Sequence, residues 1–265
     1  MSGFWSQAAP GWIRHAERTD TVGRPLGAAA IEWLRAAVGT GAGRRIVDVG
    51  CGCGGSTAEL GAVGVDVSAE MVAAARRRFP DVAFVCADVE AVREIPGAPF
   101  DAAFSRTALM LLADCSAIRR SLRPGAALAA TVFRDAAANP WLPAALLGAA
   151  PHLGALPPLP VGDEPGPFAW ADPGRAHRIL AAAGFGAIAV EPVDVVLEPA
   201  DEPEVVAEWL IELGPAGPPY RAAGPDGRAA ARAGAARLLD RFRVPGTGYR
   251  LPAGLWLVTA RAVRE

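Results

Sequence analysis

Apolar residues follow two different periods along the first half of the chain. Over residues 24–38, Ile31, Leu34 and Val38 recur at helical spacing, and Gly39 ends the pattern. Further on, short apolar runs typical of buried strands alternate with segments of helical period. These runs cover residues 46–49, 62–68, 82–88, 99–105 and 122–133. Because connections this short join parallel strands by right-handed crossovers, the alternation predicts an open, doubly wound, mostly parallel α/β sheet.

Polar residues mark where the connecting helices begin. Ser56 is in position to cap a brief helix that ends near Gly61, and Ser68 is in position to cap a helix that continues to Arg78. A further helix is predicted over about residues 114–122. All of these helices are short, as crossovers between neighbouring strands often are.

The second half of the chain is less regular. Residues 134–170 are rich in proline and alanine and follow no strand period, which favours a cap inserted over the sheet. Asp172 is expected to cap the next helix. Two more strands are expected to pair antiparallel at the sheet edge, at residues 187–198 and 254–263. Between them, residues 199–250 form a second predicted cap insertion in a single domain over residues 1–265.

The composition of this domain argues against several classes of binding partner. The 265 residues carry a net charge of -2, which provides no attraction for nucleic acid or an anionic membrane. No apolar run approaches the ~20 residues that span a bilayer. The first residues lack the basic and apolar regions of a signal peptide, so a cytoplasmic protein is expected. All 26 basic residues are arginine, which excludes a Schiff-base lysine and the lysine of a P-loop.

A glycine-rich turn, residues 50–55, directly follows the first predicted strand. At the carboxyl edge of a doubly wound sheet such a turn is where ligands bind, and glycine lets them lie against bare backbone. Gly50, Gly52 and Gly55 satisfy the G-x-G-x-x-G pattern, so a nicotinamide cofactor is compatible with the turn. The Cys-x-Cys pair within it has poor spacing for zinc, so no metal is predicted and the four cysteines are interpreted as small apolar core residues.

Three carboxylates indicate whether the turn binds a nicotinamide cofactor or a ligand without phosphate. Asp48 lies inside the first strand, Asp66 ends the second and Asp88 ends the third. A carboxylate behind the turn repels a phosphate but organises an ammonium group, while carboxylates at strand ends accept hydrogen bonds from ribose hydroxyls and an adenine amine. The three together favour a ligand with adenosine, a cationic amino acid and no phosphate, namely S-adenosylmethionine. The plain alternatives are that Asp48 braces the turn and that Asp66 and Asp88 are solvated strand ends.

Several motifs in order resemble those of the class I S-adenosylmethionine-dependent methyltransferases. They are "VDVGCGCGG", "VGVDVS", "VCADVE", "FDAAFSRTALML" and "LRPGAALAATVF", all within residues 40–135. The segments "FWSQAAPGWIRHAERTD", "NPW", "PGPFAWADPGR" and "AAAGF" resemble the bacterial small-molecule subgroup near the ubiquinone/menaquinone C-methyltransferases. The resemblance implies a Rossmann-like sheet of seven strands with the last one antiparallel, a cofactor-binding core at residues 40–133, and an N-terminal lid at residues 1–25.

The resemblance also implies where the cofactor lies. Its methionine part passes the backbone of the glycine turn, its ribose lies on Asp66, and its adenine lies beside Val67 and Met71. The implied cofactor-binding residues are Asp48, Gly50, Cys51, Gly52, Gly54, Asp66, Val67, Met71, Asp88, Val89 and Ser105. Only eleven residues separate Gly54 from Asp66, fewer than is common in the family, so we expect Asp66 to be displaced from the usual ribose position.

Candidates for the reaction itself are few. Of the three histidines, His15 is ranked first as base or orienter because it lies in the predicted lid. Arg106, after the fourth strand, is expected to border the methyl group or the substrate. Asn139 and Trp141, at the start of the first cap, are candidate substrate contacts, although Asn139 is also typical of a turn and Trp141 of a core.

The sequence thus predicts methyl transfer to a small, largely apolar acceptor at carbon, oxygen or nitrogen, in bacterial secondary metabolism. The alternative is a cyclase or pericyclase that binds S-adenosylmethionine without methyl transfer. A non-catalytic binding protein is a third hypothesis and a nicotinamide dehydrogenase a fourth. A homodimer is left open.

Overall fold

A computed structural model describes residues 2–39, 43–154, 162 and 164–263. Its central sheet has the strand order β3-β2-β1-β4-β5-β9-β6. The five strands from β1 to β5 are parallel, and β9 runs antiparallel to both of its neighbours. The strands are β1 (Ile46–Val49), β2 (Val63–Asp66), β3 (Phe84–Cys86), β4 (Phe100–Arg106), β5 (Leu122–Phe133), β6 (Phe185–Leu197) and β9 (Leu251–Ala262). The predicted doubly wound sheet is confirmed, with β9 one strand in from the edge that β6 forms.

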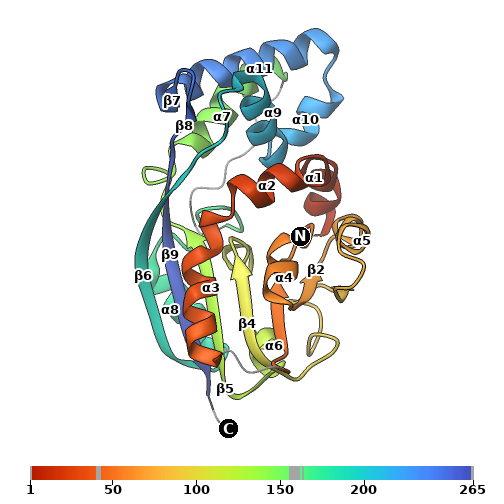
Figure 1. Cartoon of the computed structure of the whole chain (residues 1–265), viewed down its shortest axis with the longest axis vertical. Helices are drawn as coiled ribbons and strands as arrows, with labels where there is room; N and C mark the ends of the chain where they lie inside the picture. Colours follow the sequence, from red (N-terminus) through yellow and green to blue (C-terminus); the bar gives the residue numbers. More distant parts are fainter. Residues whose placement is uncertain (1, 40–42, 155–161, 163, 264–265) are drawn as a thin grey trace.

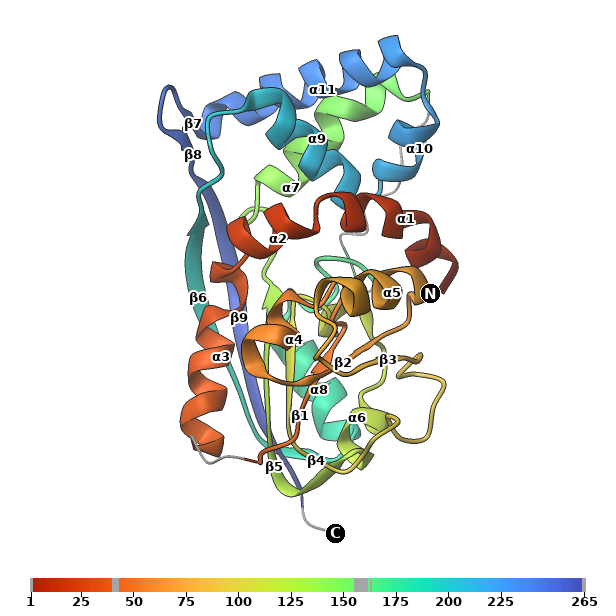
Figure 2. The ribbon, with the colours of Figure 1, turned by 45° about the vertical axis from the view of Figure 1, so that its right-hand side comes forward.

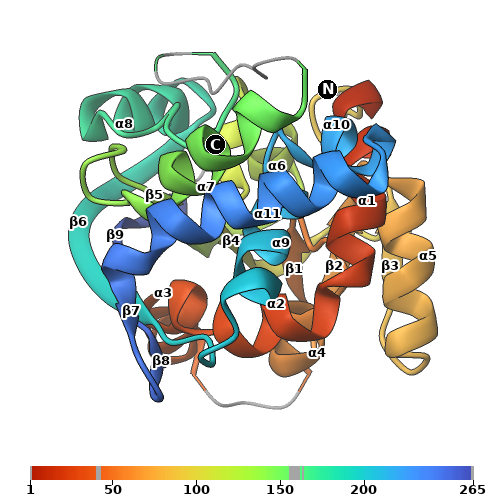
Figure 3. The same cartoon turned by 90° about the horizontal axis from the view of Figure 1, so that it is seen from above.

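Short helices cover both faces of the sheet. On one face lie α3 (Pro25–Val38), α4 (Gly55–Leu60) and α5 (Ala69–Arg78); on the other lie α6 (Ser116–Arg120) and α8 (Pro173–Ala182) (Figure 3). The apolar side of α3 buries Ile31 and Leu34 against Phe104 of β4. The predicted boundaries differ in several places: α6 is shorter than expected, β3 ends before Asp88, and β9 begins three residues before the predicted strand.

Capping residues set the starts of two of these helices as predicted. The Ser68 hydroxyl accepts a hydrogen bond from the backbone N–H of Met71, and the Asp172 carboxylate accepts one from Gly174. The prediction for Ser56 was wrong. The N-cap of α4 is Gly54, and Ser56 is the second residue of the helix, where its hydroxyl donates to Asp48 instead.

A layer of helices lies above the carboxyl ends of the strands (Figure 1). This cap layer consists of α7 (Trp141–Ala149), α9 (Pro203–Leu213), α10 (Gly217–Ala222) and α11 (Pro225–Leu239), with the hairpin β7 (Arg243–Val244) and β8 (Gly248–Tyr249) beside it. The two predicted insertions supply it, and α11 crosses it from one side to the other (Figure 3). Residues 155–161 and 163 of the first insertion lie outside the described residues.

The first two helices, α1 (Ser2–Arg14) and α2 (Ala16–Val22), lie between the cap layer and the core (Figure 2). We call these two helices the lid. On the core side, Trp12 packs with Met71 of α5 and with Cys53. On the cap side, the Trp209 indole N–H donates to the Thr19 hydroxyl at 3.0 Å. The lid is therefore held from both sides above the carboxyl edge of the sheet. In the described part of the chain, no helix is long and apolar enough to cross a membrane.

Candidate functional site

The glycine turn after β1 has a backbone that only glycine adopts readily. Gly50, Gly52 and Gly54 have φ angles of 72°, 53° and 89°. A Cβ at Gly50 would lie 2.3 Å from the Cβ of Ala108, so that glycine is required by packing. At Gly52 the position of a Cβ has no atom within 4 Å. The turn therefore presents bare backbone at Gly52, with open space beside it for a ligand.

Asp66, at the end of β2, lies directly against this turn. One carboxylate oxygen accepts from the N–H of Gly52 at 2.8 Å, and the other accepts from the N–H of Ser68 at 2.9 Å. Burial raises the pKa of Asp66, although these N–H groups act in the opposite direction. Each oxygen keeps a lone pair for a ribose hydroxyl. The six residues of α4 bring Asp66 to the turn, and its expected displacement from the usual ribose position stays a prediction.

Asp48 is fully buried and faces α4 rather than the open edge of the sheet. One carboxylate oxygen accepts from the hydroxyls of Ser56 and Thr57 at 2.8 and 2.7 Å, so the side chain braces the turn from behind. The other oxygen, Oδ1, is buried and has no hydrogen-bond partner among the described residues. Burial raises the pKa of Asp48. The bracing alternative accounts for one oxygen, and the second is an acceptor suited to an ammonium group or a water bound to it.

The end of β3 lies beside the end of β2, because the Ala87 N–H donates to the Asp66 carbonyl at 3.0 Å. Asp88 follows, and its carboxylate accepts from the Glu90 N–H at 2.9 Å. The described residues show no contact that joins Asp88 to Asp48 or Asp66. The structure therefore brings Asp48 and Asp66 to one turn and places Asp88 at the neighbouring strand tip.

Three other residues implied to bind the cofactor, Met71, Val89 and Ser105, are buried in different parts of the structure. Met71 is buried against the lid, and Val89 is part of the main core. The Ser105 hydroxyl is buried and donates to the Val49 carbonyl at 2.8 Å, which ties β4 to β1. Their roles toward a cofactor stay predictions, and Ser105 has a structural role at the same position.

The cysteines do not form a reactive group. Burial raises the pKa of Cys51 and Cys115, and it raises that of Cys53 to about 11. These three thiols stay protonated at neutral pH, as expected for small core residues. The interpretation was wrong for Cys86, which is exposed.

Arg106, at the end of β4, forms an ion pair with Asp20 of the lid. The Arg106 guanidinium lies 3.1 Å from one Asp20 oxygen, and that of Arg78 lies 2.6 Å from the other. Arg78 also donates to the carbonyl of Cys53, inside the glycine turn, at 2.7 Å. Neither Asp20 nor Arg78 was among the predicted site residues. Asp20 belongs to "HAERTD" and Arg78 to the run "RRR", and both patterns are typical of solvated helix surfaces.

His15 points toward the cap layer. Its Nε2 lies 3.5 Å from a carboxylate oxygen of Glu212, which is fully buried on α9. Burial alone would raise the pKa of Glu212, but the facing His15 and the charge of Arg14 lower it below its ordinary value. No described contact joins His15 to the glycine turn. The role of His15 as a base therefore stays a prediction, and Glu212 is a partner that the sequence did not reveal.

Asn139 and Trp141 make contacts that packing explains. The Asn139 amide is buried and donates to the carbonyls of Asp135 and Gly254 at 3.0 and 2.9 Å. The Trp141 indole N–H donates to the Pro252 carbonyl at 2.9 Å. These are the turn and core roles expected as alternatives, and the substrate role of either residue stays a prediction.

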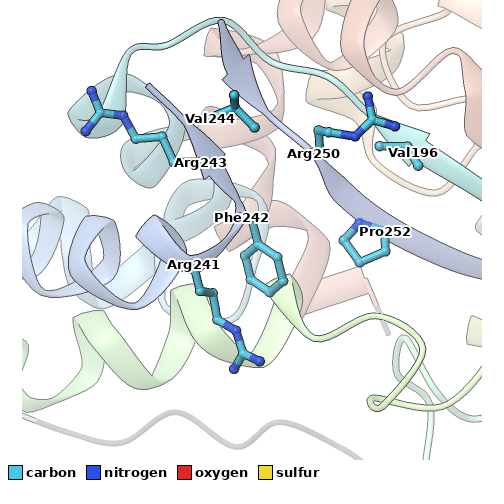
Figure 4. A pocket seen from close by; sticks show the side chains of 7 residues that line it. All are labelled: Val196, Arg241, Phe242, Arg243, Val244, Arg250 and Pro252. Atoms are coloured by element: carbon cyan, nitrogen blue, oxygen red, sulfur yellow. The ribbon is translucent and has the colours of Figure 1, made fainter. Parts of the chain in front are cut away.

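A hollow on the surface beside the hairpin β7–β8 is separate from the glycine turn (Figure 4). Arg241, Arg243 and Arg250 line it, and their guanidinium groups point in different directions. Two of them are paired, Arg243 with Asp201 and Arg250 with Glu198. None of the predicted site residues lines this hollow, so it is not assigned to the reaction.

Comparison with known proteins agrees with the geometry. Residues 46–125 match the family model described as "Methyltransferase domain". Trans-aconitate 2-methyltransferase from Azoarcus sp. (strain BH72) is 40% identical over 101 residues, which are 34% of this chain and 39% of that protein. Demethylmenaquinone methyltransferase from Beutenbergia cavernae is 37% identical over 123 residues, which are 42% of this chain and 50% of that protein. The chain thus matches no more than half the length of these curated relatives.

Among solved structures, the YcgJ protein from Bacillus subtilis is similar in fold to most of this chain. It has a TM-score of 0.54 at 14% identity, and the alignment covers 89% of this chain and 99% of that one. The fold, the glycine turn with Asp66, and the matched domain agree with one another. They confirm the resemblance seen in the sequence, and S-adenosylmethionine is the cofactor of the family concerned. Residues 46–125 thus carry a methyltransferase domain, and this part of the chain is similar to class I S-adenosylmethionine-dependent methyltransferases.

Proposed function

We propose that this protein transfers the methyl group of S-adenosylmethionine to a small molecule held beneath the lid. The observation that supports this most is the position of the lid, which lies between the cap layer and the core (Figure 2) and whose Trp12 carbonyl contacts the thiol of Cys53 in the glycine turn. Methyl transfer from a sulfonium is an in-line displacement that depends mainly on alignment and on exclusion of water. A site covered by two helical layers suits a small acceptor better than a macromolecule.

The residues at the turn fit the cofactor. When bound, S-adenosylmethionine would supply an electrophilic methyl group on a sulfonium. Asp66 would accept hydrogen bonds from its ribose, and the open space at Gly52 would admit its methionine part. The unpartnered oxygen of Asp48 would provide negative charge toward the ammonium group.

The acceptor that we propose is largely apolar and belongs to bacterial secondary metabolism. The lid supports the first part, because Trp5, Trp12 and Ile13 form an apolar cluster with Met71 and Cys53 next to the turn. The motif resemblance of the lid and cap segments supports the second. The atom that receives the methyl group is carbon, oxygen or nitrogen.

Incubation of the purified protein with methyl-deuterated S-adenosylmethionine and a cell extract tests the proposed reaction. We expect a small-molecule product whose mass carries the three deuterium atoms, formed together with S-adenosylhomocysteine. A rearranged product without deuterium, formed while the cofactor stays intact, would instead support the cyclase alternative. Heat-treated protein serves as the control for transfer by other components.

The pH dependence of cofactor binding reports on Asp66. Because burial raises its pKa above the ordinary value of 3.8, the carboxylate takes up a proton at a higher pH than an exposed aspartate does. The charged form accepts the ribose hydrogen bonds, so affinity for S-adenosylhomocysteine is expected to fall on acidification and to be restored on return to neutral pH. Calorimetry on Asp66→Asn shows whether Asp66 causes this pH dependence. Because asparagine does not titrate, the affinity of the variant for S-adenosylhomocysteine should change less over the same pH range.

A further inference from the structure

Asp20 of the lid lies between two arginines that come from different elements of the core. Arg78 ends α5, and Arg106 ends β4. The Asp20 carboxylate contacts them through separate oxygens, at 2.6 Å and 3.1 Å. The three side chains are partly buried, with Arg106 only 18% exposed. Two guanidinium groups thus converge on one carboxylate.

This carboxylate lies over the glycine turn. A Cβ at Gly55 would be 2.1 Å from an Asp20 oxygen, so the absence of a side chain there makes room for Asp20. Arg78 is anchored to the same turn through the Cys53 carbonyl. Asp20 therefore packs against the end of the glycine turn at Gly55, and Arg78 joins it to Cys53 within the same turn.

Asp20 is the acid that contacts both arginines, and the charge of Arg106 also acts on the buried Asp48. Two arginines face one aspartate, and each guanidinium has further N–H donors in a planar fork suited to a carboxylate. In the described part of the chain, Asp20 is the acid that forms an ion pair with Arg106. Removal of Asp20 from this position would leave a two-arginine site beside the glycine turn, open to another carboxylate.

We propose that Arg78 and Arg106 form a carboxylate-binding subsite, which Asp20 occupies in the closed lid and which a carboxylate of the bound ligand takes over. The proposal rests on the proposed function, because it concerns ligands of that same turn. The carboxylate comes either from the amino-acid end of the cofactor or from the acceptor. In both cases the ligand competes with Asp20, so that its binding is coupled to movement of the lid.

Binding to the Asp20→Asn variant tests the competition. The probes are S-adenosylhomocysteine and 5′-methylthioadenosine, which has the adenosyl group but no amino-acid carboxylate. If the cofactor supplies the carboxylate, calorimetry should show S-adenosylhomocysteine bound about tenfold more tightly by the variant, the effect of one charge-assisted contact no longer contested. The affinity for 5′-methylthioadenosine should not change. The further change Arg106→Gln should abolish the gain.

Succinate, a dicarboxylate, tests whether the acceptor rather than the cofactor supplies the carboxylate. If the acceptor supplies the carboxylate, Asp20→Asn leaves the affinity for S-adenosylhomocysteine unchanged, and the loaded variant binds succinate at least tenfold more tightly than the loaded wild type does. Either pattern supports the subsite.

Glu202→Gln is the matched control, because Glu202 pairs with Arg18 of the same lid helix at 2.9 Å without contact to the two arginines. The proposal is overturned if this control reproduces the effects of Asp20→Asn. It is also overturned if Asp20→Asn weakens binding, or if it changes neither the affinity for S-adenosylhomocysteine nor that for succinate, since Asp20 would then only brace the lid. Failure of the proposed function gives a different result, because no variant would then bind either adenosyl compound, which overturns both.

Discussion

Replacement of Asp66 by alanine is expected to weaken the binding of S-adenosylhomocysteine roughly 30- to 1000-fold. The change removes two hydrogen bonds between ribose hydroxyls and a charged acceptor, a loss of about 2–4 kcal/mol in total. It also releases the N–H groups of Gly52 and Ser68, which Asp66 now holds at 2.8 and 2.9 Å. The glycine turn thus loses the Asp66 side chain that packs against it and the hydrogen bonds that hold its backbone in place. Titration calorimetry measures the effect.

Two variants separate these contributions. Asp81→Ala removes an exposed carboxylate from the turn before β3, which is not among the predicted site residues, and should leave the affinity unchanged. Asp66→Asn keeps one carbonyl acceptor for the turn, so it should restore thermal stability more fully than affinity. An Asp66→Ala protein that binds as tightly as the wild type would remove Asp66 from the cofactor site.

Replacement of Gly11 by alanine is expected to detach the lid from the cap layer. A Cβ at Gly11 would lie 2.5 Å from the Glu212 carbonyl, which is closer than real contacts allow. Alanine favours the helix by about 1 kcal/mol relative to glycine, but overpacking of this kind costs about 1–3 kcal/mol. The net effect is therefore expected to destabilise the docked lid. Trypsin should then cleave after Arg18, which the docked lid protects in part, several-fold faster than in the wild type.

Methyl transfer should fall in the same variant, about tenfold, because a loosened lid admits water and loses alignment. Gly224→Ala is the control, since a Cβ at Gly224 would meet no atom within 4 Å. It should change neither cleavage nor transfer. Unchanged protection of Arg18 in Gly11→Ala would show that the contact between α1 and α9 does not hold the lid.

Local signals in the sequence were sufficient for much of the core. Alternating periods predicted the parallel strands, and Ser68 and Asp172 cap the helices that they were expected to cap. The position of the glycine turn after the first strand was also predicted, whereas the hydrogen bond between Gly52 and Asp66 was seen only in the structure. The predicted features depend on backbone conformation and on neighbours in the chain.

The features that the sequence did not reveal depend on distant contacts. Asp20 meets Arg78 and Arg106, which are 58 and 86 positions further along the chain, and His15 meets Glu212 in the second insertion. No periodicity predicts which charged side chains will face one another between elements that are distant in the sequence. The sequence also could not predict that Asp48 faces α4. A strand residue points to one of the two faces of the sheet, and helices cover both faces.

A crystal structure of the protein with S-adenosylhomocysteine tests the central claim most directly. The account predicts that both ribose hydroxyls lie within hydrogen-bond distance of the Asp66 carboxylate and that the amino-acid part runs along the backbone at Gly52. An adenosyl group bound elsewhere in the molecule, with Asp66 still engaged only by Gly52 and Ser68, would contradict it.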